Sequence, residues 1–378
     1  MNIGLLGMGT IGSGVFEILE KRSDIRVSRV LDLREIAGLE GRLTRRFEDI
    51  LEDPAIDTVV ELLGGLEPAH TFAVRSMQAG KHFVTANKLM VSTHFSELMR
   101  VADEAGVEFR FSACVGGGIP YLYNLLRARR ADRVLEVGGI VNGTTNLILD
   151  TMQSTGADFQ EVLLQAQRMG YAEADPSADI DGLDARSKLA ISMNLAFDVC
   201  IDPTAIPTAG IRHLHKGDVE AFAALGYACR FLTRAVRQED GRLSAYVEPT
   251  LLPASAIEAA VGKNDNLISF TGEYAGVQKF FGQGAGKFPT GYAVVEDLID
   301  ILGPDRLPLC GRYAPTDLAN HLVSQSYYLR TSAPLNVEAE SLGENRYRTR
   351  PLPVGEMHSR AEEMRRADPE LFFAGIRE

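Results

Sequence analysis

The densest group of candidate catalytic and binding side chains lies between residues 170 and 188. Five carboxylates fall within twelve residues of a turn-rich segment, and a lysine follows them: Glu173, Asp175, Asp179, Asp181, Asp184 and Lys188. Like charges at this density repel one another unless something positive lies among them. The segment therefore predicts a bound cation, a substrate ammonium group or a lysine partner. A solvated acidic loop with one surface ion pair is the alternative interpretation.

The spacing within this segment favours a lysine partner over a calcium ion. Asp184 and Lys188 are four residues apart at the expected start of a helix, so both should lie on one helical face. Residues 179–182 have the Asp-x-Asp-Gly order of a calcium-binding loop, yet no glutamate follows at the twelfth position of such a loop. We therefore do not expect calcium.

The N-terminus carries a glycine pattern typical of dinucleotide binding. A short apolar run leads into Gly7, Gly9 and Gly12, and the apolar spacing of a helix follows. In such a unit the first glycine permits a tight turn, the second lets the backbone approach the pyrophosphate and the third lets helix pack on strand. The pyrophosphate binds at the helix N-terminus, so we expect Thr10 and Ile11 to contact the cofactor with the glycines.

The end of the second expected strand, residues 27–33, indicates the type of cofactor. Asp32 lies about where such folds place the acidic residue that binds the ribose hydroxyls, which favours NAD. Arg34 could instead pair with the 2′-phosphate of NADP, and a solvated turn aspartate is a further alternative. The pattern thus favours NAD weakly and leaves NADP open.

A further candidate, Lys88, follows the expected strand over residues 82–85. It would lie at the carboxyl edge, where open α/β sheets bind their ligands. An isolated lysine in this position is more often simply solvated. Together with Lys188, the acidic cluster and a dinucleotide site, it suggests a dehydrogenase that acts on a small amino acid.

The order of the elements predicts an α/β fold. Strands alternate with helical segments in the first third of the chain, which indicates a Rossmann-type doubly wound parallel sheet. The expected parts are a dinucleotide-binding domain over residues 1–133, an inserted mixed α/β domain for substrate binding and dimerisation over 134–281, a return segment that packs on the first domain over 282–331, and a charged arm or surface helix over 332–378. The clearest expected helices cover residues 72–80, 159–169, 184–197 and 292–302.

The composition of the 378 residues, 45% hydrophobic and 24% charged, is that of an ordinary globular protein. The net charge of −12 repels phosphate backbones and anionic lipid, so neither nucleic acid nor a membrane is an expected partner. No apolar stretch reaches the roughly 20 residues needed to span a bilayer, and no signal-peptide pattern opens the sequence. We expect a cytoplasmic protein with four reduced, mostly buried cysteines: Cys114, Cys200, Cys229 and Cys310.

Six segments follow one another in an order typical of one family: residues 7–14, 60–68, 79–88, 139–146, 170–188 and 282–290. On these segments the chain resembles the homoserine dehydrogenase family over about its first 330 residues. Only residues 170–188 are highly specific by themselves, but the ordered set is distinctive. The resemblance implies reversible NAD(P)-linked interconversion of L-homoserine and L-aspartate 4-semialdehyde, the branch step toward threonine and methionine.

The resemblance also implies roles for individual residues. It places two lysines and one aspartate at the reacting centre: Lys88, Lys188 and Asp184. One lysine would take the hydroxyl proton as C4 passes its hydride to the nicotinamide. Substrate binding is implied for Glu173, Asp179, Gly143 and Thr144, and cofactor contacts for Gly64, Lys88 and Gly286. Members of this family tend to pair through their substrate domains, which implies a homodimer or a dimer of dimers.

The chain departs from the family pattern in three places. Ser112 stands where members commonly have a glutamate ligand of a monovalent cation, so a sodium or potassium site would depend mostly on the backbone carbonyls of Cys114, Val115 and Gly117. The residue before Asp32 is a leucine instead of the family's common arginine, which weakens the expectation of NADP. The tail is too short and too charged for the regulatory domain of many members, so we expect no threonine feedback.

Two other functions are compatible with these residues. Another nicotinamide-dependent dehydrogenase of a small amino acid or semialdehyde would share the cofactor motifs and the ammonium-attracting cluster. A dinucleotide-sensing protein that has lost turnover would keep the fold and the glycines. The presence of both lysines together with Glu173 and Asp184 argues against the sensor.

Overall fold

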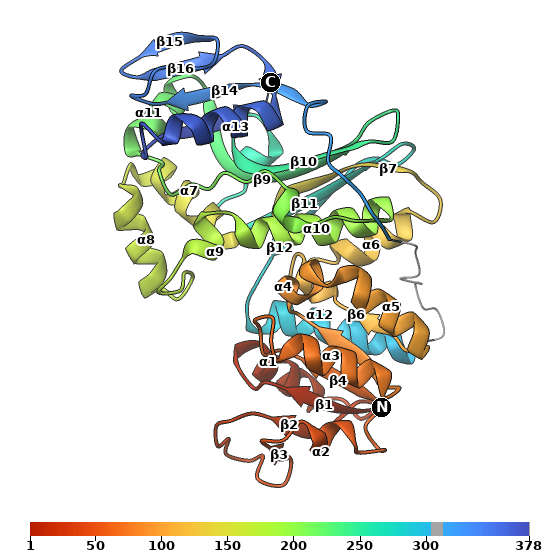
Figure 1. Ribbon diagram of the computed structural model, residues 1–378. Coiled ribbons are helices and arrows are strands. Elements are labelled where there is room, and N and C mark those ends of the chain that lie inside the picture. The colour runs from red at the N-terminus through yellow and green to blue at the C-terminus, as the bar shows by residue number, and fades with distance from the viewer. Residues whose placement is uncertain (304–312, 378) are drawn as a thin grey trace. The chain divides into compact units, whose positions relative to one another are not determined.

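The computed structural model describes residues 1–303 and 313–377, and it divides into two compact units (Figure 1). The first unit comprises Met1–Ala131, Ala190–Cys200 and Gly282–Pro315. The second comprises Asp132–Leu189, Ile201–Phe281 and Thr316–Glu378. The segment that returns to the first unit thus ends at Pro315 instead of residue 331, because Thr316 onward packs within the second unit.

The first unit is built on a six-stranded sheet with the order β3-β2-β1-β4-β5-β6. Every pairing in this sheet is parallel. The strands are β1 Asn2–Leu6, β2 Arg26–Leu31, β3 Leu43–Thr44, β4 Thr58–Glu61, β5 His82–Thr85 and β6 Phe109–Arg110. The predicted doubly wound parallel sheet is therefore confirmed, and its strand order reverses beside β1, where such folds bind their ligands.

Helices cover both faces of this sheet. They are α1 Thr10–Leu19, α2 Glu48–Leu51, α3 Ala69–Gln78, α4 Lys88–Thr93, α5 Phe95–Ala105, the 3-10 helix η1 Ser112–Cys114, α6 Tyr121–Ala128 and α12 Lys287–Leu302. A small sheet of β8 Val199–Cys200 and β13 Ala314–Pro315 completes the unit. The helix expected from residue 292 thus begins five residues earlier, at Lys287.

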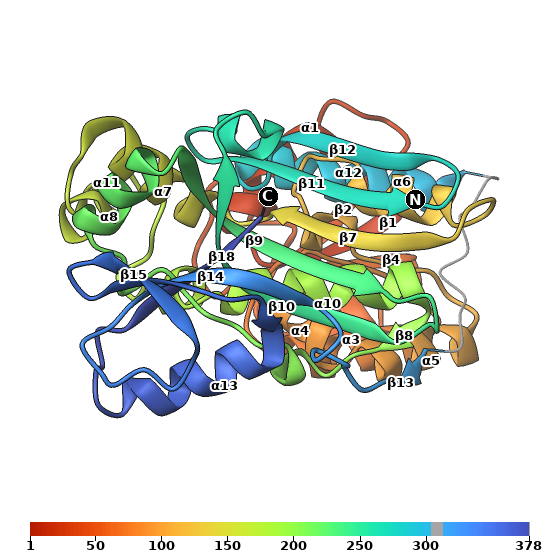
Figure 2. The same cartoon turned by 90° about the horizontal axis from the view of Figure 1, so that it is seen from above.

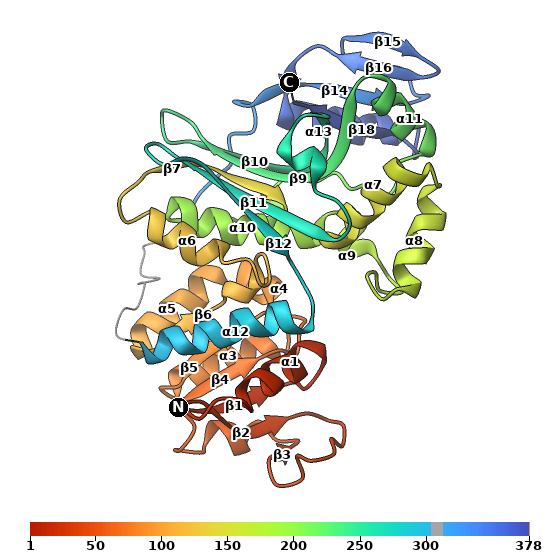
Figure 3. The ribbon, with the colours of Figure 1, turned by 180° about the vertical axis from the view of Figure 1, so that it is seen from behind.

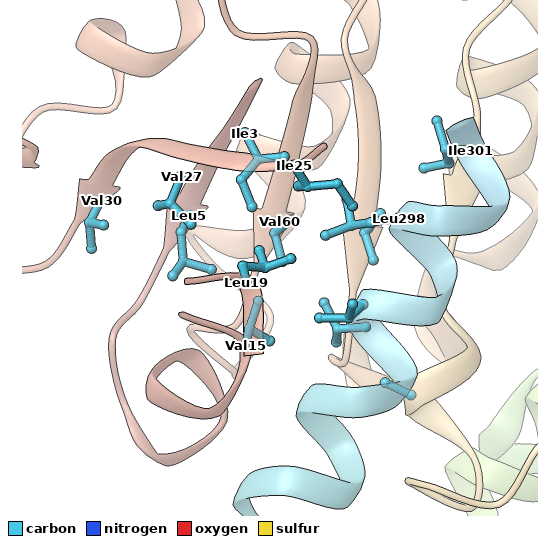
Figure 4. Packing of buried hydrophobic residues seen from close by; sticks show 14 of the residues in the cluster. Ile3, Leu5, Val15, Leu19, Ile25, Val27, Val30, Val60, Leu298 and Ile301 are labelled. Carbon is cyan, nitrogen blue, oxygen red and sulfur yellow. The ribbon is translucent and has the colours of Figure 1, made fainter. Parts of the chain in front are cut away.

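The core of the first unit joins the N-terminal strand to a helix from late in the chain. Val15 of α1 and Leu298 of α12 are fully buried in one apolar cluster with Leu5 of β1 (Figure 4). Helices α1 and α12 lie side by side (Figure 3). They pack so closely that a Cβ on Gly14 would lie 2.3 Å from the carbonyl oxygen of Lys287. This contact holds the start of α12 beside the glycine turn.

The second unit contains a mixed sheet of ten strands with the order β12-β11-β7-β9-β10-β18-β14-β16-β15, and β17 pairs with β14. These strands are β7 Val134–Ile140, β9 Tyr227–Arg237, β10 Leu243–Pro253, β11 Asp265–Gly272, β12 Gly276–Gln283, β14 Ser324–Arg330, β15 Ala339–Gly343, β16 Arg346–Thr349, β17 Leu352–Pro353 and β18 Phe372–Ile376. The helical elements are α7 Gly143–Thr155, α8 Phe159–Arg168, α9 Ser177–Ile180, α11 Lys216–Ala224 and α13 Val354–Arg365, with 3-10 turns η2 Pro203–Ala205 and η3 Ile257–Ala260. Helix α10 Leu183–Phe197 begins in this unit, and its residues from Ala190 onward belong to the first unit. Helices α7, α8 and α11 lie together beside the sheet (Figure 2).

The expectation of a charged arm over residues 332–378 is wrong. Strand β18 is buried along its whole length and pairs in parallel with β10 and antiparallel with β14. Helix α13 packs Met357, Ala361 and Met364 against Phe373 of that strand. The charged side chains of this segment lie in and around β15 and β16 as well as on α13, so composition alone did not reveal the buried residues between them.

Three cysteines, Cys114, Cys200 and Cys229, form no disulfide among the described residues, as expected, while Cys310 lies outside those residues. Burial raises the pKa of the Cys229 thiol to about 12, so this side chain remains a neutral thiol at physiological pH. Among the helices of residues 1–303 and 313–377, none has both the length and the apolar character needed to cross a bilayer.

Candidate functional site

The three glycines of the N-terminal turn occupy three different environments. Gly7 has a φ of +95°, which other residues rarely adopt, and lies close to the carbonyl of Leu62. A Cβ on Gly12 would lie 2.1 Å from the carbonyl oxygen of Gly7, so α1 approaches the turn as only a glycine permits. A Cβ on Gly9 would meet nothing within 4 Å, which leaves open space at the first turn of α1. These environments match the turn, packing and phosphate-approach roles of such glycines.

Asp32 lies beside this turn, directly after β2, and it is held by four hydrogen bonds. Its carboxylate accepts from the backbone N–H groups of Met8 (2.9 Å) and Arg34 (3.0 Å) and from Nε and Nη2 of the Arg34 side chain (3.0 and 2.8 Å). The Arg34 guanidinium lowers the pKa of Asp32, so the carboxylate is ionised at neutral pH. The two residues that the sequence proposed for cofactor selection are therefore paired with each other.

A buried network positions the next two cofactor candidates, Gly64 and Lys88. The carboxylate of Glu61 accepts from the N–H groups of Leu63 and Gly64 on one oxygen and from the Thr85 hydroxyl (2.6 Å) on the other. The Thr85 hydroxyl accepts in turn from the N–H of Asn87.

Asn87 completes this network and begins helix α4. Its side chain donates to the carbonyl of Gly65 (2.6 Å) and accepts from the N–H of Met90, which caps α4. Lys88 is the first residue of that helix and is half-buried. One chain of contacts thus fixes both the loop after β4 and the lysine after β5.

The second unit brings together part of the acidic segment. Nζ of Lys188 lies 2.7 Å from Oδ2 of Asp184 and donates to the carbonyl of Val141, also at 2.7 Å. Both side chains are more than nine-tenths buried. The i, i+4 pair predicted from the sequence is present on α10, but it is a buried ion pair and not a surface one.

Asn142 links this ion pair to a second carboxylate. Its side-chain nitrogen donates to Asp179 (2.7 Å) and to Asp184 (2.9 Å), and its oxygen accepts from the N–H of Thr145 to cap α7. Burial, together with the nearby charge of Asp184, raises the pKa of Asp179 above its usual range. Two carboxylates, one lysine and one amide therefore form a compact polar cluster, which we call the Lys188 cluster.

The remaining residues of the acidic segment have other environments. Asp181 forms an ion pair with Arg212 at 2.6 Å, and Asp175 accepts from the N–H of Ser177 at the start of α9. Glu173 is exposed in the preceding loop. The Thr144 hydroxyl donates to the carbonyl of Tyr171, which ties this loop to α7.

Close packing also explains two of the predicted glycines. A Cβ on Gly143 would approach the Asn264 carbonyl to 2.7 Å, so the start of α7 lies tightly against that segment. Gly286 precedes α12 with a φ of +123°, a backbone conformation that favours glycine.

The residues expected to hold a monovalent cation lie in and after the short helix η1. Cys114 and Val115 lie at the end of η1, and Gly117 packs against the backbone of Gly284. The buried carboxylate beside this turn is Asp297, which accepts from the N–H of Ser112 at 2.9 Å. Burial raises its pKa to about 7, so it supplies less than a full negative charge at neutral pH. We derive no catalytic step from a bound cation.

Sequence reasoning assigned no role to Glu61, Thr85 or Asn142. The signals were present, since Glu61 ends a buried strand and Asn142 precedes a helical segment at the position of an N-cap. Neither signal reveals the long-range partners, which lie 24 residues away for Glu61 and 37 or 42 residues away for Asn142.

The first unit has the fold and glycine turn of a dinucleotide-binding domain, and the second holds a buried acid–lysine cluster, the combination found in dehydrogenases. Family models agree with this class: residues 7–112 match "Homoserine dehydrogenase, NAD binding domain" and residues 120–299 match "Homoserine dehydrogenase". The chain belongs to the homoserine dehydrogenase family of NAD(P)-dependent oxidoreductases.

Curated relatives and solved structures agree with this family. A homoserine dehydrogenase of Bacillus subtilis is 36% identical over 355 residues, covering 90% of this chain and 80% of the relative. One of Synechocystis is 40% identical over 318 residues, covering 80% and 73%. The crystal structure of a homoserine dehydrogenase from Thiobacillus denitrificans has a TM-score of 0.89 at 32% identity and covers 100% of this chain and 98% of that one. That of S. aureus has a TM-score of 0.77 at 28% identity with the same coverage.

Proposed function

We propose that this enzyme interconverts L-homoserine and L-aspartate 4-semialdehyde, with a nicotinamide dinucleotide as hydride carrier, in the biosynthesis of threonine and methionine. The observation that best supports the proposal is the Lys188 cluster, because it holds one ammonium-bearing side chain between fixed acceptors deep in the second unit. The proposed substrate is an amino acid with a hydroxyl group, and the cluster has groups suited to both ends of it.

The proton of the substrate hydroxyl must leave when C4 gives up its hydride. We assign Lys188 as the base. Its amine takes this proton in the neutral form, after its own proton has left for solvent, and Asp184 and the carbonyl of Val141 fix its direction. For Lys88, which the Asn87 cap holds at the start of α4, we propose a role in the same reaction. The nicotinamide, when bound, supplies the hydride acceptor.

The substrate ammonium group requires an anionic partner near the same cluster. Asp179 suits this role because Asn142 already satisfies one of its oxygens, and a cationic ligand would offset the burial that raises its pKa. Glu173, exposed on the adjacent loop, is the second candidate. Gly143 and Thr144 hold the backbone on which these groups depend.

The preferred cofactor in this proposal is NAD. Asp32 presents an ionised carboxylate at the end of β2, which can accept from ribose hydroxyls but would face a 2′-phosphate with like charge. Arg34 offsets this charge, so its removal should increase discrimination against NADP. We expect Arg34→Ala to lower kcat/KM for NADP more than for NAD. A larger loss with NAD would contradict the assignment.

The decisive experiment measures initial rates of homoserine-dependent reduction of NAD and NADP. Lys188→Ala should lower kcat by roughly 10²–10⁴-fold, the range for loss of a general base. The matched control is Lys216→Ala, which removes an exposed lysine from an i, i+4 acid–lysine pair in the same unit. Equal rates in the two variants would refute the role of Lys188. No turnover despite cofactor binding would favour the sensor, and turnover with a different amino acid only would favour another dehydrogenase.

The proposal includes a cytoplasmic homodimer or dimer of dimers. Strand β12 lies at the edge of the large sheet and exposes the apolar side chains of Val277 and Phe281, by 58% and 63%. A second copy that covers this edge would remove both from water. Light scattering during gel filtration tests the assembly, and a monomer at micromolar concentration would contradict it.

A further inference from the structure

Two histidines and a glutamate gather on the surface of the first unit, away from the glycine turn. His70 lies in the first turn of α3, His94 lies between α4 and α5, and Glu97 lies in the first turn of α5. One ligand atom from each residue lies within 4.8 Å of the other two. The side chains of His70, His94 and Glu97 are 17%, 31% and 43% exposed, so an ion from solution can reach them.

The hydrogen-bonding pattern of His70 points to a cation. Its Nε2 lies 3.0 Å from Oε2 of Glu97, and its Nδ1 lies 3.4 Å from Oε1 of Glu67. A neutral imidazole carries one N–H, so it can donate to only one of these two carboxylates. The other nitrogen then presents a lone pair to a carboxylate oxygen, unless a proton or a metal ion lies between them.

We propose that His70 Nε2, His94 Nδ1 and Glu97 Oε2 form a binding site for a zinc-class divalent transition-metal ion. Zinc binds imidazole nitrogen and carboxylate oxygen at about 2.0–2.2 Å, which separates neighbouring ligand atoms of a tetrahedron by about 3.4 Å. Glu97 Oε2 already lies 3.0 Å from His70 Nε2 and 3.5 Å from His94 Nδ1. The ion would replace the shared proton, and water would complete its coordination.

The surroundings of His70 resemble the outer shell of a metal site. A histidine ligand commonly donates its second N–H to a carboxylate, which fixes the ring and its tautomer. Glu67 is placed to accept from Nδ1 of His70, and the Thr71 hydroxyl donates to Glu67 at 2.8 Å.

Metal binding requires one rearrangement. The rings of His70 and His94 are stacked, with centroids 3.9 Å apart and planes 18° from parallel. Two stacked rings cannot both direct an in-plane lone pair at one ion, so His94, the more exposed ring, must rotate about its Cβ–Cγ bond. The site would then tie α3 to α5 and fix the ends of the segments that carry Gly64 and Lys88.

Zinc titration of the untagged full-length chain against a chromogenic chelator tests this site. We expect one ion per chain, insensitivity to excess Mg²⁺ or Ca²⁺, and a visible absorption band when Co²⁺ is used instead. His94→Ala and Glu97→Gln should each weaken binding by at least roughly tenfold, and so should the positioning variant Glu67→Gln. His321→Ala, which removes an exposed histidine of the second unit, should bind zinc like the unchanged chain.

The outcomes separate clearly. Zinc should also raise the melting temperature of the unchanged chain and of His321→Ala, but not that of His94→Ala. No stoichiometric zinc binding at micromolar concentration would overturn the proposal, as would His94→Ala and Glu97→Gln variants that bind zinc as tightly as the unchanged chain. The result is independent of homoserine turnover, because none of these residues belongs to the Lys188 cluster or to the glycine turn.

Discussion

Alanine substitution of Gly9 and Gly12 should separate cofactor binding from folding. The two positions are three residues apart at the same turn, and the same methyl group is added at each. At Gly9 the new Cβ meets nothing within 4 Å, whereas at Gly12 it lies 2.1 Å from the carbonyl oxygen of Gly7. Gly9→Ala should therefore fold normally and bind cofactor weakly, and Gly12→Ala should fold poorly.

The magnitudes follow from these distances. A methyl carbon and a carbonyl oxygen need about 3.4 Å, so α1 must retreat by about 1.3 Å in Gly12→Ala. Overpacking costs about 1–3 kcal/mol. We expect the upper end of this range, because the new methyl group on the α1 backbone meets the backbone carbonyl of Gly7, which has no side-chain freedom with which to move aside. In a unit of about 150–250 residues, a loss of about 3 kcal/mol lowers the melting temperature by about 6–12 °C.

Gly9→Ala should leave stability almost unchanged. Its φ of −76° and ψ of −156° suit alanine, and the reduced freedom of the unfolded chain stabilises by about 0.4–1 kcal/mol. Gly9 is also the N-cap of α1, where alanine is less favourable than glycine by about the same free energy, so the stabilising and destabilising effects cancel. The methyl group, however, takes the space through which the pyrophosphate approaches, and the loss of one charge-assisted hydrogen bond of about 1.5–3 kcal/mol weakens Kd by about 10–100-fold.

The assays are thermal unfolding and titration with the reduced cofactor, followed through its own fluorescence because the chain has no tryptophan. Gly41→Ala is the control, since a Cβ there also meets nothing within 4 Å and the residue lies outside the turn. An unchanged cofactor Kd in Gly9→Ala would refute the placement of the pyrophosphate. An unchanged melting temperature in Gly12→Ala would refute the close approach of α1.

Three further substitutions test the buried polar groups. Asp184→Ala leaves Lys188 without its carboxylate, so we expect a loss of about 3–5 kcal/mol in urea unfolding and of nearly all turnover; a stable variant would contradict a buried ion pair. Asn142→Ala removes a helix cap and both carboxylate contacts, which should cost about 1–3 kcal/mol and raise KM for homoserine; an unchanged KM would count against its bridging role. Asp297→Asn should raise the free energy of unfolding above pH 7. The carboxyl has a pKa of about 7 in the folded chain and 3.8 in the unfolded chain, so its ionisation in the buried position lowers stability as pH rises between these values. Unfolding measured from pH 4 to pH 8 should show that the gain vanishes near pH 4, and an equal gain at pH 4 and pH 8 would refute burial of the ionised carboxylate as its cause.

The parallel sheet of the first unit could be predicted from the sequence because its signals are local. Each buried strand is a short apolar run, and Gly7 and Gly12 mark where the first strand turns into a helix. The tail could not be predicted in this way. Strand β18 pairs with β10, which lies more than 100 residues earlier, and no local pattern in a five-residue apolar run reveals such a partner.

The candidate site shows the same division between local and long-range information. The Asp184–Lys188 pair followed from helical spacing, and its presence on α10 confirms that part of the prediction. The burial of this pair could not be predicted from the spacing. The groups that stabilise it in the interior, the carbonyl of Val141 and the amide of Asn142, lie more than 40 residues earlier in the sequence. A buried charge is stable only with such partners, so spacing alone cannot distinguish a surface pair from a buried one.

Asn142 shows why the fold and the site of the second unit depend on each other. Its side-chain oxygen accepts a hydrogen bond from the N–H of Thr145 in the first turn of α7. Aspartate or serine could also cap the helix in this way. Its nitrogen must at the same time donate to Asp179 and Asp184, and only an amide offers an acceptor and two donors in one short side chain. Asparagine is therefore the residue that can cap this helix and at the same time donate to two neighbouring carboxylates beside Lys188, which partly offsets their repulsion.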